Sequence, residues 1–227
     1  AIRHYATKRI ACAKEAGYAL FGRGNNFIVI NNGIDLSRFS YKPAIRKDTR
    51  IELNIPQDAT VLLNIARFQE VKNHTYLIDV FKEYIKIHPN SHLLLVGDGP
   101  LRNTIENKVR KLKLANCISF TGVRSDTEKM YNSADIFVMP SIFEGLPVVL
   151  IEAQANRLPC IVSDSIDHDV KINDNFNFLN IHLAPSEWAT AIKLCKKRRG
   201  QKSHKLDKLY DIKNIVKQLA SIYKEVL

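Results

Sequence analysis

The stretch ATVLLNIARFQEVKNHTYLIDVFKEYIKIHPNSHLLLVG, residues 59–97, decides the predicted fold. It begins and ends with a short, nearly continuous hydrophobic run, which is typical of strands that are covered on both faces. Between these runs, Leu77, Val80, Phe81 and Tyr84 recur at helical spacing. A strand, a helix and a second strand in this order predict a parallel β-α-β unit with a right-handed crossover.

The same alternation continues along most of the chain. We therefore predict an α/β fold: a Rossmann-like, doubly wound parallel sheet with helical extensions at both ends. Strands are expected at residues 26–32, 59–67, 91–97, 117–122, 135–141, 159–164 and 176–181, and helices at 74–89, 100–115, 127–134, 147–157, 185–197 and 210–227. In terms of domains, we expect a helical segment over residues 1–24, the Rossmann-like domain over 25–200 and a C-terminal helical segment over 201–227.

Composition places the chain among ordinary globular proteins. Of its 227 residues, 45% are hydrophobic and 25% are charged. The four cysteines are scattered and form no C-x-x-C pair, so we expect reduced thiols in a cytoplasmic protein, with Cys117 and Cys160 in strands. No apolar run approaches the roughly 18–20 residues of a transmembrane helix.

The formal net charge of +11 suggests an acidic partner. The basic residues concentrate in KLCKKRRGQKSHKLDK, Lys193 to Lys208. This stretch is either a solvated helix end with its loop or a patch that holds the protein at anionic membrane lipid, and the sequence leaves both interpretations open. A nucleic-acid partner is disfavoured, because aromatic residues do not interleave with these charges.

In an open parallel sheet, ligands bind beyond the carboxyl ends of the strands. Four loops predicted at that edge carry basic residues or Gly-rich turns: RFQEVKNH, with Arg67 and Lys72, then GDGPLR, TGVRSD and PSIFEGLPVVLIE. This composition would suit a nucleoside diphosphate.

The last of these loops places two carboxylates, Glu144 and Glu152, around an apolar segment. Gly145 can adopt backbone angles closed to other residues and would let a ligand approach the main chain. Pro147 suits the first position of a helix, which we expect to begin near Leu146. The free amides of a helix N-terminus attract anionic or hydroxyl-rich ligands. The alternative is that Glu144 is a surface residue and Glu152 pairs locally.

Several other site classes are disfavoured. GDGPLR lacks the third glycine of a dinucleotide fingerprint, which argues against NAD. The chain has neither a P-loop nor a G-x-S-x-G nucleophile motif. His74 lies at a helix start, where a structural role is the more common one.

Taken in order, these motifs resemble a known family. The chain is similar to the C-terminal, donor-binding domain of retaining GT-B glycosyltransferases, group 1 (family 4), which use nucleotide sugars. The E-x7-E spacing of Glu144 and Glu152 is weak alone and specific in the order of the other motifs. The matching segments are 31–39, 65–74, 93–102, 118–126 and 134–164, with the region of Trp188 as a further candidate.

The resemblance implies a role for each matching residue. Glu144 would bind hydroxyls of the donor sugar, Glu152 would bind the ribose hydroxyls, and Val123 would flank the base. Arg67 and Lys72 would neutralise the diphosphate as the sugar leaves, so that no metal or other cofactor is implied. The implied catalytic residues are Glu144, Arg67 and Lys72, and the implied donor-binding residues are Gly97, Gly99, Val123, Phe143, Gly145, Leu146, Pro147, Val148 and Glu152.

Two departures from the family pattern bear on function. Arg157 stands where many relatives have glycine, and we expect it to cost little and to satisfy the last helix carbonyls. The family has two Rossmann-like domains, whereas this sequence predicts one, so we expect weak donor binding and little catalysis from this chain by itself.

The resulting prediction is the donor-binding part of a retaining transferase that moves a hexosyl unit from an NDP-sugar, expected to be a UDP-sugar. The acceptor would be a glycan or a lipid-linked saccharide, in capsular, exo- or lipopolysaccharide synthesis at the inner face of the cell membrane. The alternatives are a UDP-sugar 2-epimerase of the same fold and a non-catalytic nucleotide-sugar-binding subunit.

Overall fold

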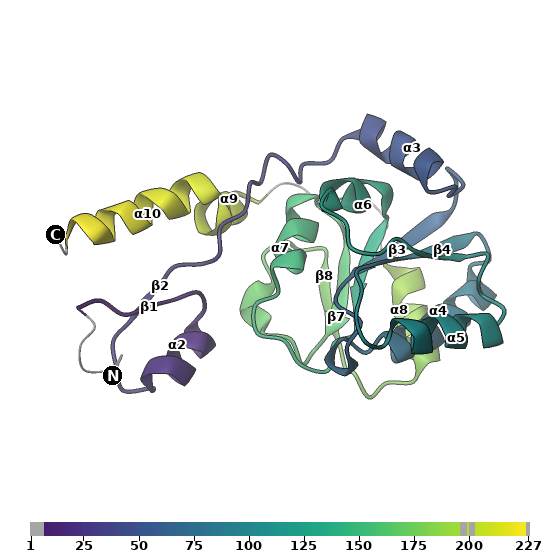
Figure 1. The fold of residues 1–227 in the computed structure, drawn as a ribbon, viewed down its shortest axis with the longest axis horizontal. Coiled ribbons are helices and arrows are strands. Elements are labelled where there is room, and N and C mark those ends of the chain that lie inside the picture. The colour runs from purple at the N-terminus through teal and green to yellow at the C-terminus, as the bar shows by residue number, and fades with distance from the viewer. Residues whose placement is uncertain (1–6, 196–198, 200–202, 226–227) are drawn as a thin grey trace.

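The computed structural model describes residues 7–195, 199 and 203–225. Its centre is one sheet of six parallel strands (Figure 1). The strands follow the spatial order β5-β4-β3-β6-β7-β8, so the predicted α/β fold with a doubly wound parallel sheet is confirmed. The strands are β3 (Thr60–Ile65), β4 (Ser91–Val96), β5 (Ile118–Phe120), β6 (Ile136–Met139), β7 (Cys160–Ser163) and β8 (Phe176–Leu179).

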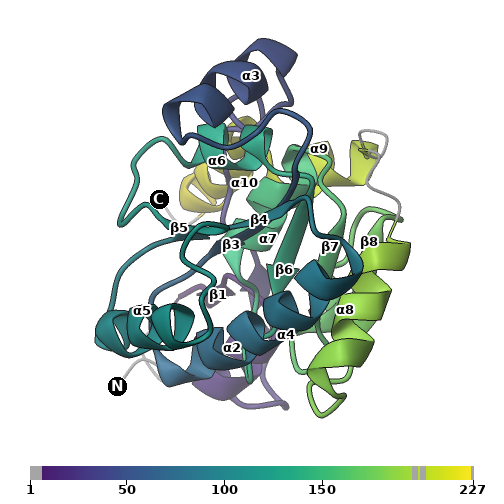
Figure 2. The ribbon, with the colours of Figure 1, turned by 90° about the vertical axis from the view of Figure 1, so that its right-hand side faces the viewer.

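Both faces of the sheet are buried, because alternate residues of each strand enter two separate hydrophobic cores. On β3, Val61 and Leu63 pack into one core, and Leu62 packs into the other. Helices α4 (His74–Ile87), α5 (Arg102–Lys111) and α8 (Pro185–Leu194) cover the Leu62 face (Figure 2). Helices α6 (Thr127–Ser133) and α7 (Val148–Ala155) cover the opposite face.

The strand order reverses direction between β3 and β6. From β3 the chain winds outward through β4 to β5, and it then crosses back to β6 and winds the other way to β8. In such sheets the crevice beyond the carboxyl ends of the strands at this switch point is where ligands bind.

The N-terminal region differs from the prediction. Instead of one long helix, the structure has β1 (Ile10–Ala11), α2 (Lys14–Phe21) and β2 (Ile28–Val29), and β1 pairs with β2 in parallel. The strand expected at 26–32 therefore lies outside the main sheet. The prediction was wrong there because a short apolar run does not reveal which strand it will pair with.

Two helices also escaped the prediction. Helix α3 (Pro43–Glu52) packs against α6, and α9 (His204–Tyr210) precedes the expected C-terminal helix, α10 (Ile212–Lys224). Figure 1 shows α10 beside the β1-α2-β2 unit, away from the six-stranded sheet. Backbone hydrogen bonds from Ile34 to Tyr210 (2.8 Å) and from Ile212 to Ile34 (3.0 Å) hold this end of the chain to the segment that follows β2. The predicted domain limits at residues 24 and 200 stay a prediction.

The basic stretch from Lys193 to Lys208 is only partly described, since residues 196–198 and 200–202 lie outside the described residues. Within it, Arg199 is not a solvated charge. Its guanidinium lies 3.9 Å from the centre of the Tyr41 ring and donates to the carbonyls of Asn156 (2.9 Å) and Ala134 (2.9 Å). Burial lowers the pKa of Arg199 to about 10.

The contact of Arg199 with Asn156 also corrects the expectation for Arg157. The helix-end carbonyl of Asn156 is satisfied by Arg199, whereas Arg157 adopts the left-handed conformation with φ of 62°. A non-glycine residue in that conformation costs about 1–2 kcal/mol, which explains why glycine suits this position.

The thiols fit the sequence prediction in part. Cys160 is buried in β7, whereas Cys117 lies just before β5 and is half-buried, and both are free. Among the described helices, none is long and apolar enough to cross a membrane.

Candidate functional site

The four loops predicted at one edge of the sheet do meet there. The Phe68 amide donates to the carbonyl of Asp98 (3.0 Å), which joins the loops after β3 and β4. The Gly97 amide donates to the carbonyl of Gly122 (2.8 Å), which adds the loop after β5. The Ile142 amide donates to the carbonyl of Val71 (2.8 Å), which brings in the loop after β6.

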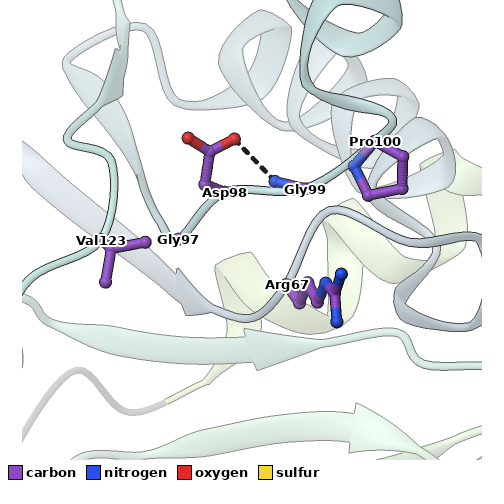
Figure 3. Close-up of a pocket in the computed structure, with 6 residues that line it drawn as sticks. All are labelled: Arg67, Gly97, Asp98, Gly99, Pro100 and Val123. Carbon is purple, nitrogen blue, oxygen red and sulfur yellow. Dashed lines mark hydrogen bonds between the residues drawn. The ribbon is translucent and has the colours of Figure 1, made fainter.

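A pocket of about 560 Å³ opens between the first three loops (Figure 3). Its volume lies within the usual range of about 300–1,000 Å³ for small-molecule sites. Four of the predicted site residues line it, together with two that the prediction did not include. The lining residues are Arg67, Gly97, Asp98, Gly99, Pro100 and Val123.

Gly97 and Gly99 are required by the backbone around the pocket. Gly97 has a φ of +131°, and a Cβ there would lie 2.1 Å from the carbonyl oxygen of Ala66. A Cβ on Gly99 would lie 2.6 Å from the carbonyl oxygen of Phe68. The two glycines therefore let the loops after β3 and β4 approach closely, which is a structural reason for their presence besides the predicted ligand contact.

The cations of the site differ in their surroundings. Arg67 is exposed and forms no ion pair with any described residue. Lys72, at the end of the short helix η1 (Glu70–Lys72), forms an ion pair with Glu144. The side chains of Lys72 and Glu144 are 20% and 14% exposed. Arg67 thus offers a guanidinium without a carboxylate partner in the described parts of the chain, while the ammonium group of Lys72 is paired.

The segment from Phe143 to Val148 departs from the prediction in its details. Gly145 has no positive φ, and a Cβ there would meet nothing within 4 Å, so this glycine is not needed for its backbone angles. Helix α7 begins at Val148 with Pro147 as its N-cap, instead of beginning near Leu146. Phe143 is exposed, and Leu146 lines a different pocket, of about 340 Å³.

Glu152 already has a partner within the protein. Its Oε2 accepts a hydrogen bond from the hydroxyl of Tyr131, at 2.7 Å. Burial raises the pKa of Glu152, while this hydrogen bond and the nearby Arg38 act in the opposite direction. The local pairing considered for Glu152 is present, whereas Glu144 is an ion-paired and mostly covered side chain instead of a surface residue. The predicted ligand roles of the two carboxylates stay predictions.

The sequence did not identify Asp98, which lines the pocket, or Tyr131 and Arg38, which lie near Glu152. Arg38 lies in the matching segment 31–39, and Tyr131 lies in the predicted helix 127–134. Arg38 forms an ion pair with Glu128 (2.7 Å) on α6 and lies close enough to Glu152 to lower its pKa. No spacing rule predicts such contacts between residues that are distant in sequence.

The surroundings of His74 agree with the structural role predicted for it, because the side chain is buried. Only 2% of the residue is exposed, its ring contacts Phe68 edge-to-face at 4.5 Å between centroids, and neither ring nitrogen has a hydrogen-bond partner in the described protein. Burial, with a contribution from Lys72, lowers its pKa to about 4. His92, also buried, has its pKa lowered to about 4, mainly by burial.

These two histidines predict a loss of stability in acid. Each histidine stays neutral in the folded protein down to about pH 4, whereas in the unfolded chain it binds a proton below about pH 6.5. Its contribution to the free energy of unfolding is therefore complete above pH 6.5, falls as the pH drops from 6.5 towards 4, and is lost below 4. Each should remove roughly 3 kcal/mol over that range. Urea unfolding between pH 7 and pH 4 checks this, and His74→Leu should remove about half of the histidine-linked loss. An unchanged pH dependence in His74→Leu would contradict the prediction.

Within the described parts of the chain, no group of three or more His, Cys, Asp or Glu side chains is arranged to hold a metal ion. The groups available for a ligand are a free guanidinium, a paired ammonium group, loop amides and two carboxylates.

Comparison of the sequence with known proteins finds a matching family. Residues 45–216 match the family model described as glycosyl transferases group 1. EpsF of Bacillus subtilis (strain 168), named as a glycosyltransferase, is 39% identical over 169 residues, which are 73% of this chain and 44% of EpsF. The UDP-Gal:alpha-D-GlcNAc-diphosphoundecaprenol alpha-1,3-galactosyltransferase of Escherichia coli is 33% identical over 68% of this chain and 41% of its own length.

Solved structures agree on the fold. Anabaena HepE, solved in complex with UDP and glucose, superposes with a TM-score of 0.84 at 21% identity, over 98% of this chain and 64% of HepE. The chain thus spans less than half the length of these two curated relatives and about two thirds of HepE.

Proposed function

This chain belongs to the group 1 glycosyl transferases, and we propose that it is the part of such an enzyme that binds the nucleotide-sugar donor. The observation that carries the proposal is the pocket at the carboxyl ends of β3, β4 and β5, with the unpaired Arg67 in its wall. A guanidinium without a protein carboxylate is suited to pair with phosphate. HepE, which has this fold, has been solved with UDP and with UDP-glucose.

The proposed reaction moves a hexosyl unit from an NDP-sugar, with UDP as the favoured nucleotide, to a glycan or lipid-linked acceptor. The bond from the anomeric carbon to the diphosphate oxygen breaks, and negative charge develops on the departing nucleotide. A bond from the same carbon to an oxygen of the acceptor forms, and the proton of that acceptor hydroxyl is released. Arg67 and Lys72 are the cations at this edge that would stabilise that charge. Glu144 would bind the donor sugar, Glu152 would bind the ribose, and the anomeric configuration would be retained.

The acceptor class and the setting rest on the relatives. The Escherichia coli relative is named for transfer to a GlcNAc-diphosphoundecaprenol. We therefore infer a polysaccharide precursor as acceptor. A basic surface near Lys193 would suit attachment to an anionic membrane, without Arg199, which donates its hydrogen bonds inside the fold.

Titration calorimetry of this chain with UDP, GDP, ADP and NAD tests the proposal. UDP or GDP is expected to bind with a micromolar to low-millimolar dissociation constant and NAD more weakly. Arg67→Ala should weaken that binding about tenfold, since a charge-assisted hydrogen bond is lost. Arg110→Ala, an exposed arginine on α5 outside the pocket, is the matched control and should change nothing. Absence of binding by every nucleoside diphosphate would contradict the proposal.

A further inference from the structure

Tyr131 joins the buried core of the domain to helix α7, which carries Glu152. It lies on α6 and is fully buried, with Phe39 and Phe137 packed against its ring at centroid distances of 5.8 Å each. Its hydroxyl reaches two acceptors on α7: Glu152 Oε2 at 2.7 Å and the carbonyl of Val149 at 3.1 Å. A buried tyrosine hydroxyl is expected to have a hydrogen-bond partner.

The hydroxyl has one proton and must choose between these acceptors. In an α-helix the carbonyl of Val149 faces the amide four residues further on, so it already has its helical partner. The carboxylate oxygen is closer and carries charge, which makes it the stronger acceptor. The hydroxyl therefore donates its hydrogen bond to Glu152 Oε2.

This hydrogen bond engages Oε2 of Glu152 and leaves Oε1 available to accept a hydrogen bond from a ligand. No other described residue donates a hydrogen bond to Glu152, and its side chain is only partly buried. A half-buried carboxylate with one hydrogen bond has unused capacity at its second oxygen. Arg38 lies nearby, but its guanidinium donates to Glu128 and to the carbonyl of Ser125.

We propose that Tyr131 is a positioning residue: it fixes Glu152 Oε2 so that Oε1 accepts hydrogen bonds from the ribose hydroxyls of the bound nucleotide. The inference rests on the proposed function, because it deepens the role given there to Glu152. Without the phenol, the carboxylate could rotate about its side-chain bonds, and part of the binding free energy would be spent on ordering it.

The test compares two nucleotides and two tyrosine variants. Tyr131→Phe keeps the ring in the core and removes only the hydroxyl. Its affinity for UDP should fall about tenfold, whereas its affinity for 2′,3′-dideoxy-UDP should equal that of the unchanged chain. Tyr76→Phe is the matched control, since it removes a hydroxyl that donates to the backbone carbonyl of Leu183 (2.7 Å) instead of to a carboxylate. It should leave both affinities unchanged.

A second variant keeps the inference testable if Tyr131→Phe is too unstable to measure. Glu152→Asp leaves Tyr131 intact and withdraws the carboxylate by one methylene, and it should show the same loss for UDP alone. Where Tyr131→Phe is stable enough to measure, it should add at most a twofold further loss in a Glu152→Gln background.

Three results would overturn the inference. Equal weakening of UDP and dideoxy-UDP would make Tyr131 a residue of the core only. Unchanged UDP binding in Tyr131→Phe would show that the carboxylate needs no such support. If the unchanged chain binds no nucleoside diphosphate, the proposed function itself fails and this inference fails with it.

Discussion

Replacing Asp135 by alanine is expected to lower the free energy of unfolding by about 3–5 kcal/mol, because it leaves a buried arginine without its counter-charge. Arg50 is completely buried on α3, and among the described residues it forms an ion pair with Asp135 Oδ2, at 2.8 Å. The same carboxylate accepts hydrogen bonds from the side chain of Arg46 (2.7 Å) and from the amide of Val61 (2.8 Å). Asp135, directly before β6, thus links α3 to β3 and β6.

Urea unfolding at constant pH measures this effect. Lys86→Ala is a suitable control, since it removes the exposed Lys86–Glu83 ion pair and should cost less than about 1 kcal/mol. Arg46→Ala should fall between the two, because Arg46 is partly exposed and Arg50 keeps its partner. A loss in Asp135→Ala no larger than that in Lys86→Ala would mean that the four backbone carbonyls that Arg50 also contacts are sufficient.

The Asp135–Arg50 pair shows where prediction from sequence ends. The main strands were predictable because they are covered on both faces, so that runs such as Val61 to Leu63 are continuously apolar. Helix α3 was not predicted, because its buried side includes a threonine and an arginine, Thr49 and Arg50, in place of an apolar stripe. The burial of Arg50 is compensated by the carboxylate of Asp135, which lies 85 residues away in the sequence. No local sequence pattern predicts such a partner.

In the candidate site, too, some features could be predicted from the sequence and others could not. The edge of the sheet, the four loops and the presence of Arg67 and Lys72 could be predicted, because parallel strands bring their carboxyl ends together. The reasons for individual residues could not. At position 97 a carbonyl oxygen lies where a Cβ would be, so only glycine fits. Gly145, in contrast, has open space around it and ordinary backbone angles. The two glutamates are found with partners, Lys72 and Tyr131, because a half-buried carboxylate is stabilised by any nearby donor.

The ion pair between Lys72 and Glu144 predicts opposite effects for its two members on nucleotide binding. Lys72→Ala removes a cation and leaves the Glu144 carboxylate unpaired beside the proposed diphosphate site. Loss of attraction and added repulsion should together weaken UDP binding about 50-fold. Glu144→Gln removes the carboxylate that competes with the diphosphate for Lys72, and it should therefore tighten UDP binding by roughly fivefold.

The matched control is Glu70→Gln, which removes a negative charge from an exposed residue of the same short helix, η1, and should leave the affinity unchanged. Calorimetry at low and at moderate salt separates the contributions, because the direct contact of Lys72 should survive salt that screens distant charges. If Glu144→Gln weakens UDP binding as Lys72→Ala does, then Glu144 holds Lys72 in its binding position instead of competing for it. The opposite signs expected here would mean that the diphosphate takes Lys72 from Glu144. Nucleotide binding would then free the Glu144 carboxylate for the sugar hydroxyls at the moment when the sugar arrives.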